Sequence, residues 1–579
     1  MPSSHFKKSL ADACTTPVED VERWYHVAYD QLHLGLEPLC SQDPTRTGIL
    51  LIESSTKGRR RPYHKQKLAT LLSCLRHFAV EAAQAGFHVQ HLFTTESYAR
   101  AIEAFYEEHD LCSPICMMRP AEYELLVELE PLCDEKILTF LAHSGWLTTE
   151  AMFLESQKSR KQSWLMDTFY KHVRRELDIL LDEEGKPLGG KFSFDADNRK
   201  PWSGSPSPPS RPTFSPEAIT AEVCELIEAH FGDHPGTLSP EHIAASRQAA
   251  LDLLERAISD CMEYFGPYED AMHTSSHHLF HTLLSPLINL HRLSPREVLD
   301  RVLALEPGEP VPLQSIEGFT RQLIGWREFM HHVHEQTCGL RALPSPRTSP
   351  ETAPEPGDAG WSAYVKAKSS WSAVKPPDPI DGGAIPNVLE AHEDLPAAFW
   401  GEATQMLCLD HVVRGVMETG WSHHIERLMI LGNLATLLDI SPRQLTDWFW
   451  VAYIDAYDWV VEPNVLGMAT FGVGDLFTTK PYVSGANYID KMSNFCSECA
   501  LDPGSTCPVT HLYWSFLSRH ARHLQDNPRM GLVYNQLGKR DASKQALDQA
   551  IFEHVRDTLR RGEALDPKRI EEIHEEHTS

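Results

Sequence analysis

The sequence contains no run of eighteen consecutive apolar residues, so it predicts no membrane-spanning segment. Its first 24 residues, MPSSHFKKSLADACTTPVEDVERW, lack the apolar core of a secretory signal. Together these absences predict a cytoplasmic protein without a membrane partner. Thiols stay reduced in that compartment, so the 13 cysteines argue against a disulfide framework.

Basic residues are scarce relative to acidic ones. The 53 Lys+Arg against 81 Asp+Glu give a net charge of −28. Taken alone, this balance argues against a nucleic-acid partner, because phosphate binding depends on cationic neutralisation. It does not exclude a local basic groove on an acidic body. With 579 residues, 42% hydrophobic and 23% charged, the chain is long enough for two or three globular domains.

Strand-like runs alternate with helical patterns between residues 25 and 185. Strands are predicted at 48–54, 88–93, 114–118 and 136–141, and amphipathic helices at 65–86 and 96–109. This alternation predicts a parallel, Rossmann-like sheet covered by helices. Neither GxGxxG nor GxxxxGK(S/T) follows any of these strands, so no nucleotide-phosphate site of those kinds is evident.

The rest of the chain is almost wholly helical in period, apart from Pro-rich stretches at 201–216, 344–360 and 375–383. We therefore expect an N-terminal extension (1–24), an α/β domain (25–185), a connector (186–235) and a larger all-helical domain (236–579). A flexible insert is expected at 344–383. No internal repeat is visible.

Three cysteines near the C-terminus are unusually close in sequence. Cys496, Cys499 and Cys507 form the pattern C-x2-C-x7-C-P in a loop-rich segment. This favours a metal site over buried packing, and soft thiolates select zinc or an iron–sulfur cluster. The spacing leaves both metals open, and the fourth ligand is either His511 or a distant cysteine. The isolated cysteines, such as Cys74, are interpreted as small core residues.

Four segments of the helical part carry unusual chemistry. HTLLSPLINL (281–290) places hydroxyls at a helix start, where they could meet a phosphate. GFTRQLIGWREF (318–329), SHHIERLMILG (422–432) and DWFWVAYIDAYDWVVEPNVLGM (447–468) add charged, histidine and aromatic side chains. Each feature alone also fits a structural role, as a core aromatic, a surface histidine pair or an ion-paired arginine.

Taken together, these segments resemble the photolyase/cryptochrome superfamily, and specifically its iron–sulfur bacterial branch, the prokaryotic (6-4) photolyases. The resemblance runs from about residue 25 to 560, with motifs in the same order. It includes KFSFDADNRKPW (191–202), GWREF, HHIERLMILGN, KPYVSGANYIDKMSNFC (480–496) and CPVTHLYWSFL (507–517). It implies an α/β domain joined by a long connector to a larger all-α domain that binds FAD and carries an iron–sulfur cluster.

The resemblance implies a role for each matching residue. The implied ligands of a [4Fe–4S] cluster are Cys408, Cys496, Cys499 and Cys507. The implied flavin-binding residues are Thr282, Leu283, Leu284 and Ser285 at the diphosphate, Gln322 and Trp326 beside the cofactor, and Arg427 and Asp455 at the isoalloxazine. The implied lesion-binding residues are Leu428, Met468 and Tyr482. The implied electron-transfer residues are Trp400, Trp448 and Tyr488, and the implied acid catalysts are His423 and His424.

The implied activity is blue-light-driven repair of (6-4) pyrimidine–pyrimidone photoproducts in UV-damaged DNA by a monomeric flavoprotein. Repair of this lesion moves a hydroxyl group between bases, and histidine suits such proton transfer near neutrality. The main alternative is a blue-light photoreceptor with the same cofactors. A third possibility is a nucleic-acid-binding protein that keeps the cluster but has lost flavin. The two histidines favour repair, because signalling needs no acid pair.

The sequence departs from the family pattern at several positions. Phe449 stands where a redox-active tyrosine often follows the tryptophan, so a hole must stop at Trp448 or leave by another route. Val461 aligns near flavin N5, where relatives carry a polar residue, and the adjacent Glu462 could substitute for it.

The resemblance also bears on a lumazine antenna in the α/β domain. Asp30 is kept in YDQL, but Lys57 and Arg60 occupy the aligned Glu and Tyr positions, so we predict that a lumazine is weakly bound or absent. The basic run 57–65 is predicted to be a solvated patch, or a contact with DNA or an anionic ligand.

Overall fold

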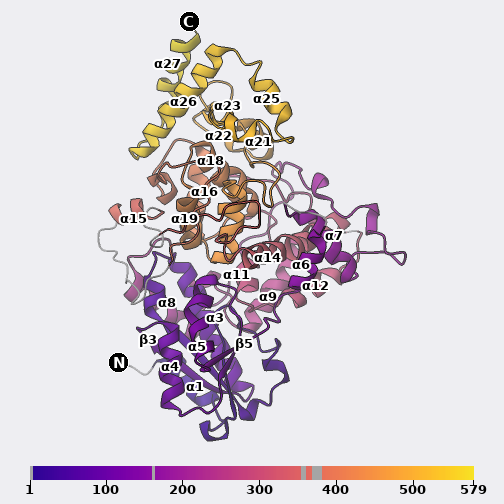
Figure 1. Ribbon diagram of the computed structural model, residues 1–579, viewed down its shortest axis with the longest axis vertical. Helices are drawn as coiled ribbons and strands as arrows, with labels where there is room; N and C mark the ends of the chain where they lie inside the picture. The colour runs from indigo at the N-terminus through magenta and orange to yellow at the C-terminus, as the bar shows by residue number, and fades with distance from the viewer. Residues whose placement is uncertain (1–3, 159–162, 309, 354–359, 368–380, 579) are drawn as a thin grey trace.

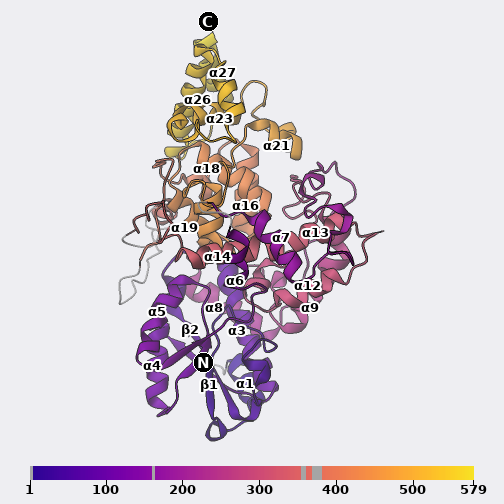
Figure 2. The ribbon, with the colours of Figure 1, turned by 45° about the vertical axis from the view of Figure 1, so that its right-hand side comes forward.

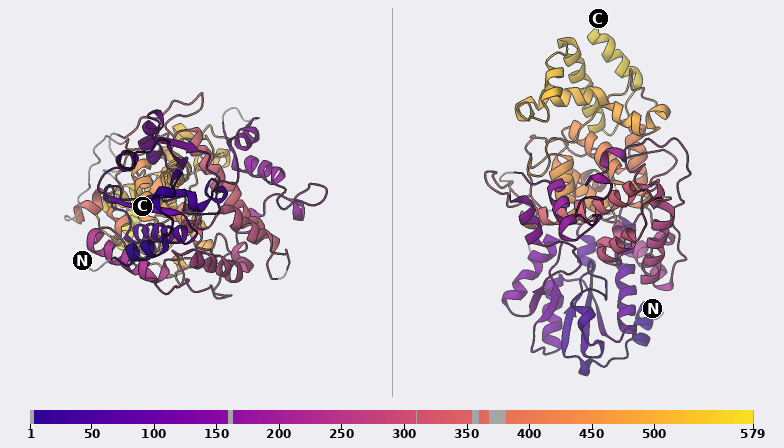
Figure 3. Two further views of the ribbon diagram at one scale, coloured as in Figure 1. Left: turned by 90° about the horizontal axis from the view of Figure 1, so that it is seen from below. Right: turned by 90° about the vertical axis from the view of Figure 1, so that its right-hand side faces the viewer.

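The computed structural model of the protein describes residues 4–158, 163–308, 310–353, 360–367 and 381–578. An α/β domain forms one end of the molecule, a helical body follows, and the C-terminal helices form the other end (Figures 1 and 3). Among the described residues, no helix has the length and apolar character needed to cross a membrane.

The α/β domain contains one five-stranded parallel sheet with the order β3-β2-β1-β4-β5. Its strands are β1 (Arg23–His26), β2 (Thr47–Ser54), β3 (His88–Thr94), β4 (Ile115–Met118) and β5 (Leu138–Leu141). The chain starts at the centre, runs to one edge and returns to the other side of β1, as in doubly wound folds. The sequence predicts four of these strands and misses the four-residue β1.

Helices cover both faces of the sheet, which explains why seven of the eight residues of β2 are buried. One face carries α4 and α5, and the other carries α1 and α3 (Figure 2). The bounds are α1 His5–Ala13, α2 Ser55–Arg59, α3 Lys65–Gln84, α4 Tyr98–Glu108 and α5 Tyr123–Asp134.

The remainder of the chain is helical. Its α-helices are α6 Glu150–Gln157, α7 Met166–Glu176, α8 Ala218–Phe231, α9 Arg247–Arg256, α10 Met262–Phe265, α11 Ser285–Asn289, α12 Pro295–Leu303, α13 Leu313–Thr320, α14 Glu328–Gln336, α15 Ser362–Ala367, α16 Leu407–Thr419, α17 His424–Glu426, α18 Asn433–Leu437, α19 Pro442–Ala452, α20 Asp458–Val461, α21 Ala486–Met492, α22 Phe495–Glu498, α23 Val509–Arg519, α24 Ala521–Leu524, α25 Gly531–Leu537, α26 Ala542–Arg560 and α27 Pro567–Thr578. The predicted fold class, a parallel α/β domain followed by a larger helical part, is confirmed.

Four π-helical segments occur among the described residues; one is η7 (Ala257–Cys261), and the other three lie at the centre of the body. These three are η8 (Arg321–Arg327), η10 (Arg427–Gly432) and η11 (Glu462–Ala469). π-helical turns are rare and are frequently found at functional sites, because the extra residue in the turn redirects side chains. All three border the cavity described below.

The basic run 57–65 is not a solvated patch, and that prediction is wrong. Lys57 Nζ lies 3.2 Å and Arg61 Nη1 2.8 Å from the carboxylate of Glu124 at the start of α5, and Arg60 pairs with the same carboxylate. The Arg61 guanidinium also lies 4.2 Å from the ring centre of Trp450 in α19. These cations are buried, and the run joins the α/β domain to the helical body.

Part of the predicted flexible insert, residues 354–359 and 368–380, lies outside the described residues. Within the described part, Trp361 and Tyr364 are buried, and the Tyr364 ring packs 4.9 Å from that of Trp400. The Tyr364 hydroxyl donates to the carbonyl of Asp233, so this short segment is fastened to the body.

Candidate functional site

A cavity of about 850 Å³ opens in the helical body. Its walls come from the turn before α11, from η8, η10 and η11, from the segment 421–425 and from α21. The volume lies within the range of small-molecule sites, roughly 300–1,000 Å³. The predicted flavin, lesion and acid positions, together with Tyr488, all line it: Thr282, Leu283, Leu284, Ser285, Gln322, Trp326, His423, His424, Arg427, Leu428, Asp455, Met468, Tyr482 and Tyr488.

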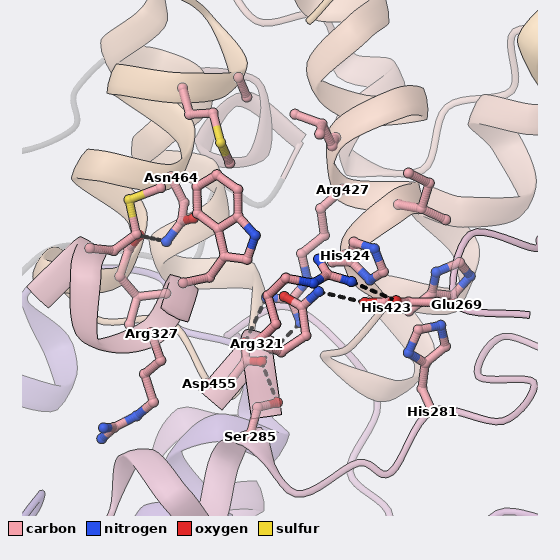
Figure 4. A pocket seen from close by; sticks show the side chains of 18 of the residues that line it. Glu269, His281, Ser285, Arg321, Arg327, His423, His424, Arg427, Asp455 and Asn464 are labelled. Carbon is pink, nitrogen blue, oxygen red and sulfur yellow. Dashed lines mark hydrogen bonds and ion pairs between the residues drawn. The ribbon is translucent and has the colours of Figure 1, made fainter. Parts of the chain in front are cut away.

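An ion pair between Arg427 and Asp455 lies in the wall of this cavity (Figure 4). The two guanidinium Nη atoms lie 3.0 and 2.9 Å from the carboxylate oxygens of Asp455. The Ser285 hydroxyl donates to the same carboxylate at 2.7 Å. Burial alone would lower the pKa of Arg427, but Asp455 outweighs it and raises the pKa. The Arg427 guanidinium therefore keeps a fixed positive charge at the cavity wall, and the Asp455 carboxylate balances it.

The two adjacent histidines have different surroundings. His424 Nε2 lies 3.4 Å from a carboxylate oxygen of Asp270, and its side chain is 40% exposed toward the opening. Burial disfavours its charge, yet the Asp270 carboxylate raises its pKa above the ordinary value. His423 is fully buried, and burial holds its pKa well below the usual range. The pair thus presents one imidazole that holds a proton readily and one that does not.

A third imidazole completes the group. The ring of His281 stacks on that of His423, with centroids 4.5 Å apart and planes at 9°. One ring nitrogen from each of His281, His423 and His424 lies within 4.8 Å of the other two. Burial and the neighbouring histidines keep the pKa of His281 well below its ordinary value. Figure 4 shows the three side chains gathered on one side of the cavity.

Gln322 is held by a buried carboxylate rather than free in the cavity. Its Nε2 donates to Glu269 at 2.5 Å, and Glu269 also accepts from Arg321 at 3.2 Å and from Asn198 at 2.8 Å. Asn198 belongs to the FDADNR segment of the connector, and Asp195 of that segment lines the cavity. The connector is thereby tied to the cavity wall.

Glu462 does not substitute for a polar residue at Val461. Its carboxylate points into the protein, where Arg443 and His334 contact it at 3.0 and 3.2 Å. Among the described residues near this position, Val461 and Asn464 line the cavity and Glu462 does not. Asn464 therefore presents a polar side chain of this segment to the cavity.

Two of the predicted electron-transfer residues lie outside the cavity wall. Trp448 is fully buried, with its ring 5.3 Å from Phe399 and 5.1 Å from the cavity-lining Phe449. The ring of Trp400 packs on Tyr364. Tyr453, another aromatic residue of the segment 447–468, stacks on Phe449 at 5.0 Å and lies under the Arg427 guanidinium at 4.3 Å.

The four predicted cysteines meet in a second, smaller hollow. Cys408 lies in the first turn of α16, Cys496 in α22, Cys499 just after it, and Cys507 shortly before α23. The rest of the lining is apolar: Met406, Ala486, Ile489, Phe495, Leu501 and Val509. Four cysteines in an apolar shell fit an iron–sulfur site. Among the described residues, no three of these sulfurs lie within 4.8 Å of one another, as a single tetrathiolate zinc ion would require. His511, the alternative fourth ligand, instead binds Asp548 at 2.8 Å.

Some cavity residues were missed by the sequence patterns. Asp270 and Glu269 come from a segment without a recognisable motif, and only the fold brings them to the cavity, whereas Trp421 directly precedes the segment 422–432. His281 could have been found, because it directly precedes the singled-out Thr282.

Fold and cavity together define a class: an α/β domain fused to a helical body that holds one large ligand cavity and a nearby tetrathiol group. The family model "Deoxyribodipyrimidine photo-lyase-related protein" matches residues 25–243. A (6-4) photolyase from Agrobacterium fabrum (strain C58) is 32% identical over 523 residues, which cover 87% of this chain and 93% of that relative. The chain therefore belongs to the photolyase family, as its motifs predict.

Other similarities are shorter or more distant. The uncharacterized protein R855 of Acanthamoeba polyphaga mimivirus is 44% identical over 66 residues, covering 11% of this chain and 54% of that protein. The crystal structure of a bacterial class III photolyase from Agrobacterium tumefaciens aligns with a TM-score of 0.49 and 14% identity, covering 93% of this chain and 99% of that one. An archaeal photolyase from Sulfolobus tokodaii aligns with a TM-score of 0.48 and 13% identity, covering 87% and 94%.

Proposed function

We propose that this protein repairs (6-4) pyrimidine–pyrimidone photoproducts in DNA under blue light, with FAD as its redox cofactor. The curated relative that it matches over most of both chains is a (6-4) photolyase. The observation that carries the proposal is one cavity that combines the fixed Arg427–Asp455 charge pair with a proton-holding histidine, His424, beside Asp270.

The cavity wall offers a binding role to each of its polar groups. Arg427 favours an anionic reduced cofactor, and Asp455 balances the buried guanidinium. Gln322 and Trp326 lie on η8 beside the same space, and Thr282–Ser285 form the turn that we assign to the diphosphate. Reduced FAD held by these residues would supply the light-driven one-electron chemistry that repair needs.

We assign proton donation to the histidines. Transfer of a hydroxyl group between the two bases needs a proton donor, and His424 keeps its proton near neutrality because Asp270 stabilises the imidazolium. Its exposure to the cavity lets it meet a nucleotide flipped out of the duplex. Leu428, Met468 and Tyr482 supply apolar and aromatic surface for the flipped base.

The other cofactor proposals rest on side chains already described. We assign a [4Fe–4S] cluster to the tetrathiol group, with a structural rather than photochemical role. Trp400, Trp448 and Tyr488 remain the proposed electron carriers. A lumazine is proposed to bind weakly or not at all, since Lys57 and Arg60 are engaged by Glu124. The protein is proposed to act as a cytoplasmic monomer.

The test is repair by a His424→Ala variant. Flavin-loaded wild-type and variant proteins are illuminated with blue light on DNA that carries either a (6-4) or a cyclobutane lesion, and restored pyrimidines are quantified. We expect the variant to bind flavin and damaged DNA but to lose (6-4) repair by at least ~10²-fold. The matched control is His230→Ala, which removes an exposed histidine on α8.

Full repair by His424→Ala would remove the acid role. A wild-type protein that repairs neither lesion, yet binds flavin and responds to light, would instead support the photoreceptor alternative. A protein that purifies without flavin would support the third possibility.

A further inference from the structure

Behind His423, on the side away from the cavity, lies a carboxylic acid. Glu426 Oε1 lies 3.5 Å from His423 Nε2, and both side chains are 0% exposed. His423 lines the cavity, whereas Glu426 does not. Among the described residues, neither the two Glu426 oxygens nor the two His423 ring nitrogens have a hydrogen-bond partner. Their 3.5 Å approach is therefore a close polar contact that does not meet hydrogen-bond geometry.

The arrangement repeats that of His424 at a deeper level. His424 and Asp270 form an outer pair at 3.4 Å, with side chains 40% and 16% exposed. His423 and Glu426 form an inner pair at almost the same distance, but enclosed by protein. Two adjacent histidines thus each face a carboxyl group of their own, one open to the cavity and one sealed behind it.

Asp270 and Glu426 differ in exposure, and they also differ in charge. Burial disfavours the Asp270 carboxylate, but its hydrogen bond with His424 outweighs this and lowers its pKa, so the outer pair is an ion pair. Burial raises the pKa of Glu426 to about 8, so near neutrality the inner pair holds its proton on the carboxyl group. Surroundings that shift the pKa values of two carboxyl groups in opposite directions separate the roles of proton donor and proton store.

Other charged groups around the inner pair do not reverse this assignment. His277 and Arg427 lower the pKa of Glu426, but burial has the larger effect. Arg427, His424 and His278 disfavour a proton on His423, whereas Asp270 favours one. Burial and the neighbouring histidines also disfavour a proton on the stacked ring of His281.

We propose that Glu426 is a positioning residue that orients His423 and stores a second proton for the cavity. When His424 has donated its proton, the Glu426 carboxyl proton passes to His423 Nε2, and His423 gives its Nδ1 proton to the now neutral ring of His424 at the cavity. One proton has then moved from Glu426 to the cavity, His423 is neutral in its other tautomer, and no electron is transferred. Ring nitrogens within 4.8 Å of one another can be bridged by a single water.

This inference rests on the proposed function, because a stored proton matters only if lesion chemistry consumes one in this cavity. It differs from the assignment of His423 and His424 as acids, because it gives the two histidines different duties. It also predicts a group outside the cavity wall on which the pH dependence of repair depends.

The first experiment is independent of repair. Infrared spectra of the flavin-loaded protein are recorded between pH 7 and pH 9.5 for wild type and Glu426→Gln. We expect the wild type to show a protonated-carboxyl band that the variant lacks and that disappears with a midpoint near pH 8. Asp30→Asn, which removes a different buried acid in the α/β domain, should leave this band in place. Identical wild-type and Glu426→Gln spectra at pH 7 would overturn the proton store.

The second experiment measures (6-4) repair against pH for wild type, Glu426→Gln and Glu426→Asp. Since the store is full below about pH 8 and empty above it, wild-type repair should decline through that value. Glu426→Gln should bind flavin and damaged DNA normally, repair about tenfold more slowly and lose this alkaline decline. Glu426→Asp, which keeps a carboxyl group, should restore part of both.

The outcomes separate the two proposals. An unchanged rate and alkaline decline in Glu426→Gln, with active wild type, would overturn the role of Glu426 and leave the repair function standing. Absence of (6-4) repair in the wild type would overturn the repair function itself. If Glu426→Gln fails to fold, Glu426→Asp decides, because a shorter acid should shift the infrared midpoint and the alkaline decline together.

Discussion

The carboxylate of Asp455 in the cavity wall accepts hydrogen bonds from both Arg427 and Ser285. Asp455→Asn should leave the Arg427 guanidinium without its counter-charge, at a cost of about 3–5 kcal/mol in the free energy of unfolding. Bound flavin per polypeptide should fall in parallel. Absorbance of the purified protein and urea unfolding measure both quantities. Asp475→Asn, which breaks an exposed pair with Arg347, should change neither.

The pKa of Glu462 predicts how the free energy of unfolding depends on pH. Burial would raise its pKa, but the hydrogen bond from His334 and the charges of Arg341 and Arg443 lower it to about 2. A depressed carboxyl pKa adds stability above the ordinary value of 4.5, and that stability disappears as the pH falls toward 2. Glu462→Gln should therefore cost on the order of 3 kcal/mol at pH 7, and the difference from wild type should shrink between pH 4.5 and 2.

Urea unfolding at several pH values checks this expectation, with the exposed Glu19→Gln as the control. A stability gap between wild type and Glu462→Gln that stays constant down to pH 2 would contradict it.

At the residue scale, sequence patterns locate side chains that carry the chemistry but not the groups that set their charge. His423 and His424 are visible as a pair in HHIER. Asp270 lies far earlier in the chain, in YEDAM, where nothing distinguishes it from a surface acid. Its effect on His424 arises only because the fold brings α17 against the loop after α10.

Helix α3 links the two parts of the molecule through one buried lysine. Lys67 Nζ donates to the carbonyls of Trp450 and Ala456, at 2.6 and 2.5 Å, around the C-terminal end of α19. Lys67→Met should leave these acceptors unsatisfied and cost about 1–3 kcal/mol. We expect the α/β domain to become sensitive to limited proteolysis before the helical body does.

A matched control lies two residues away on the same helix. Lys65 pairs at 3.1 Å with Glu228, whose side chain is 52% exposed. Lys65→Met should change stability by no more than about 1 kcal/mol. Equal proteolysis of the two variants would show that the carbonyl contacts of Lys67 do not hold the domains together.

At the element scale, periodicity predicts long helices well but not their defects. The segment GFTRQLIGWREF is helical as predicted, yet η8 turns it through a π-helical stretch. The spacing of apolar residues over so short a stretch does not reveal one extra residue in a turn. The sequence therefore does not indicate the π-helical stretch. The same limit explains why β1 was missed: four residues with three consecutive buried positions show neither alternation nor a long apolar run.

For the whole molecule, the tetrathiol group connects segments that are far apart in the chain. Cys408→Ser should lower bound iron and sulfide and reduce the soluble yield, because α16 loses its link to the segment between α22 and α23. Iron analysis and thermal unfolding measure the effect, and the exposed Cys112→Ser is the control. A soluble, cluster-free and fully repair-competent Cys408→Ser protein would contradict a structural role.

Helix α21 is only seven residues long, yet it serves two neighbours. Tyr488 faces the large cavity, while Ala486 and Ile489 face the thiols. A change at the thiols should therefore also affect a wall of the cavity in which DNA damage would be received. With the proposed [4Fe–4S] cluster at these thiols, we expect cells starved of iron to make a protein that still has access to flavin but repairs poorly. The resistance of the cells to sunlight would then depend on their supply of iron.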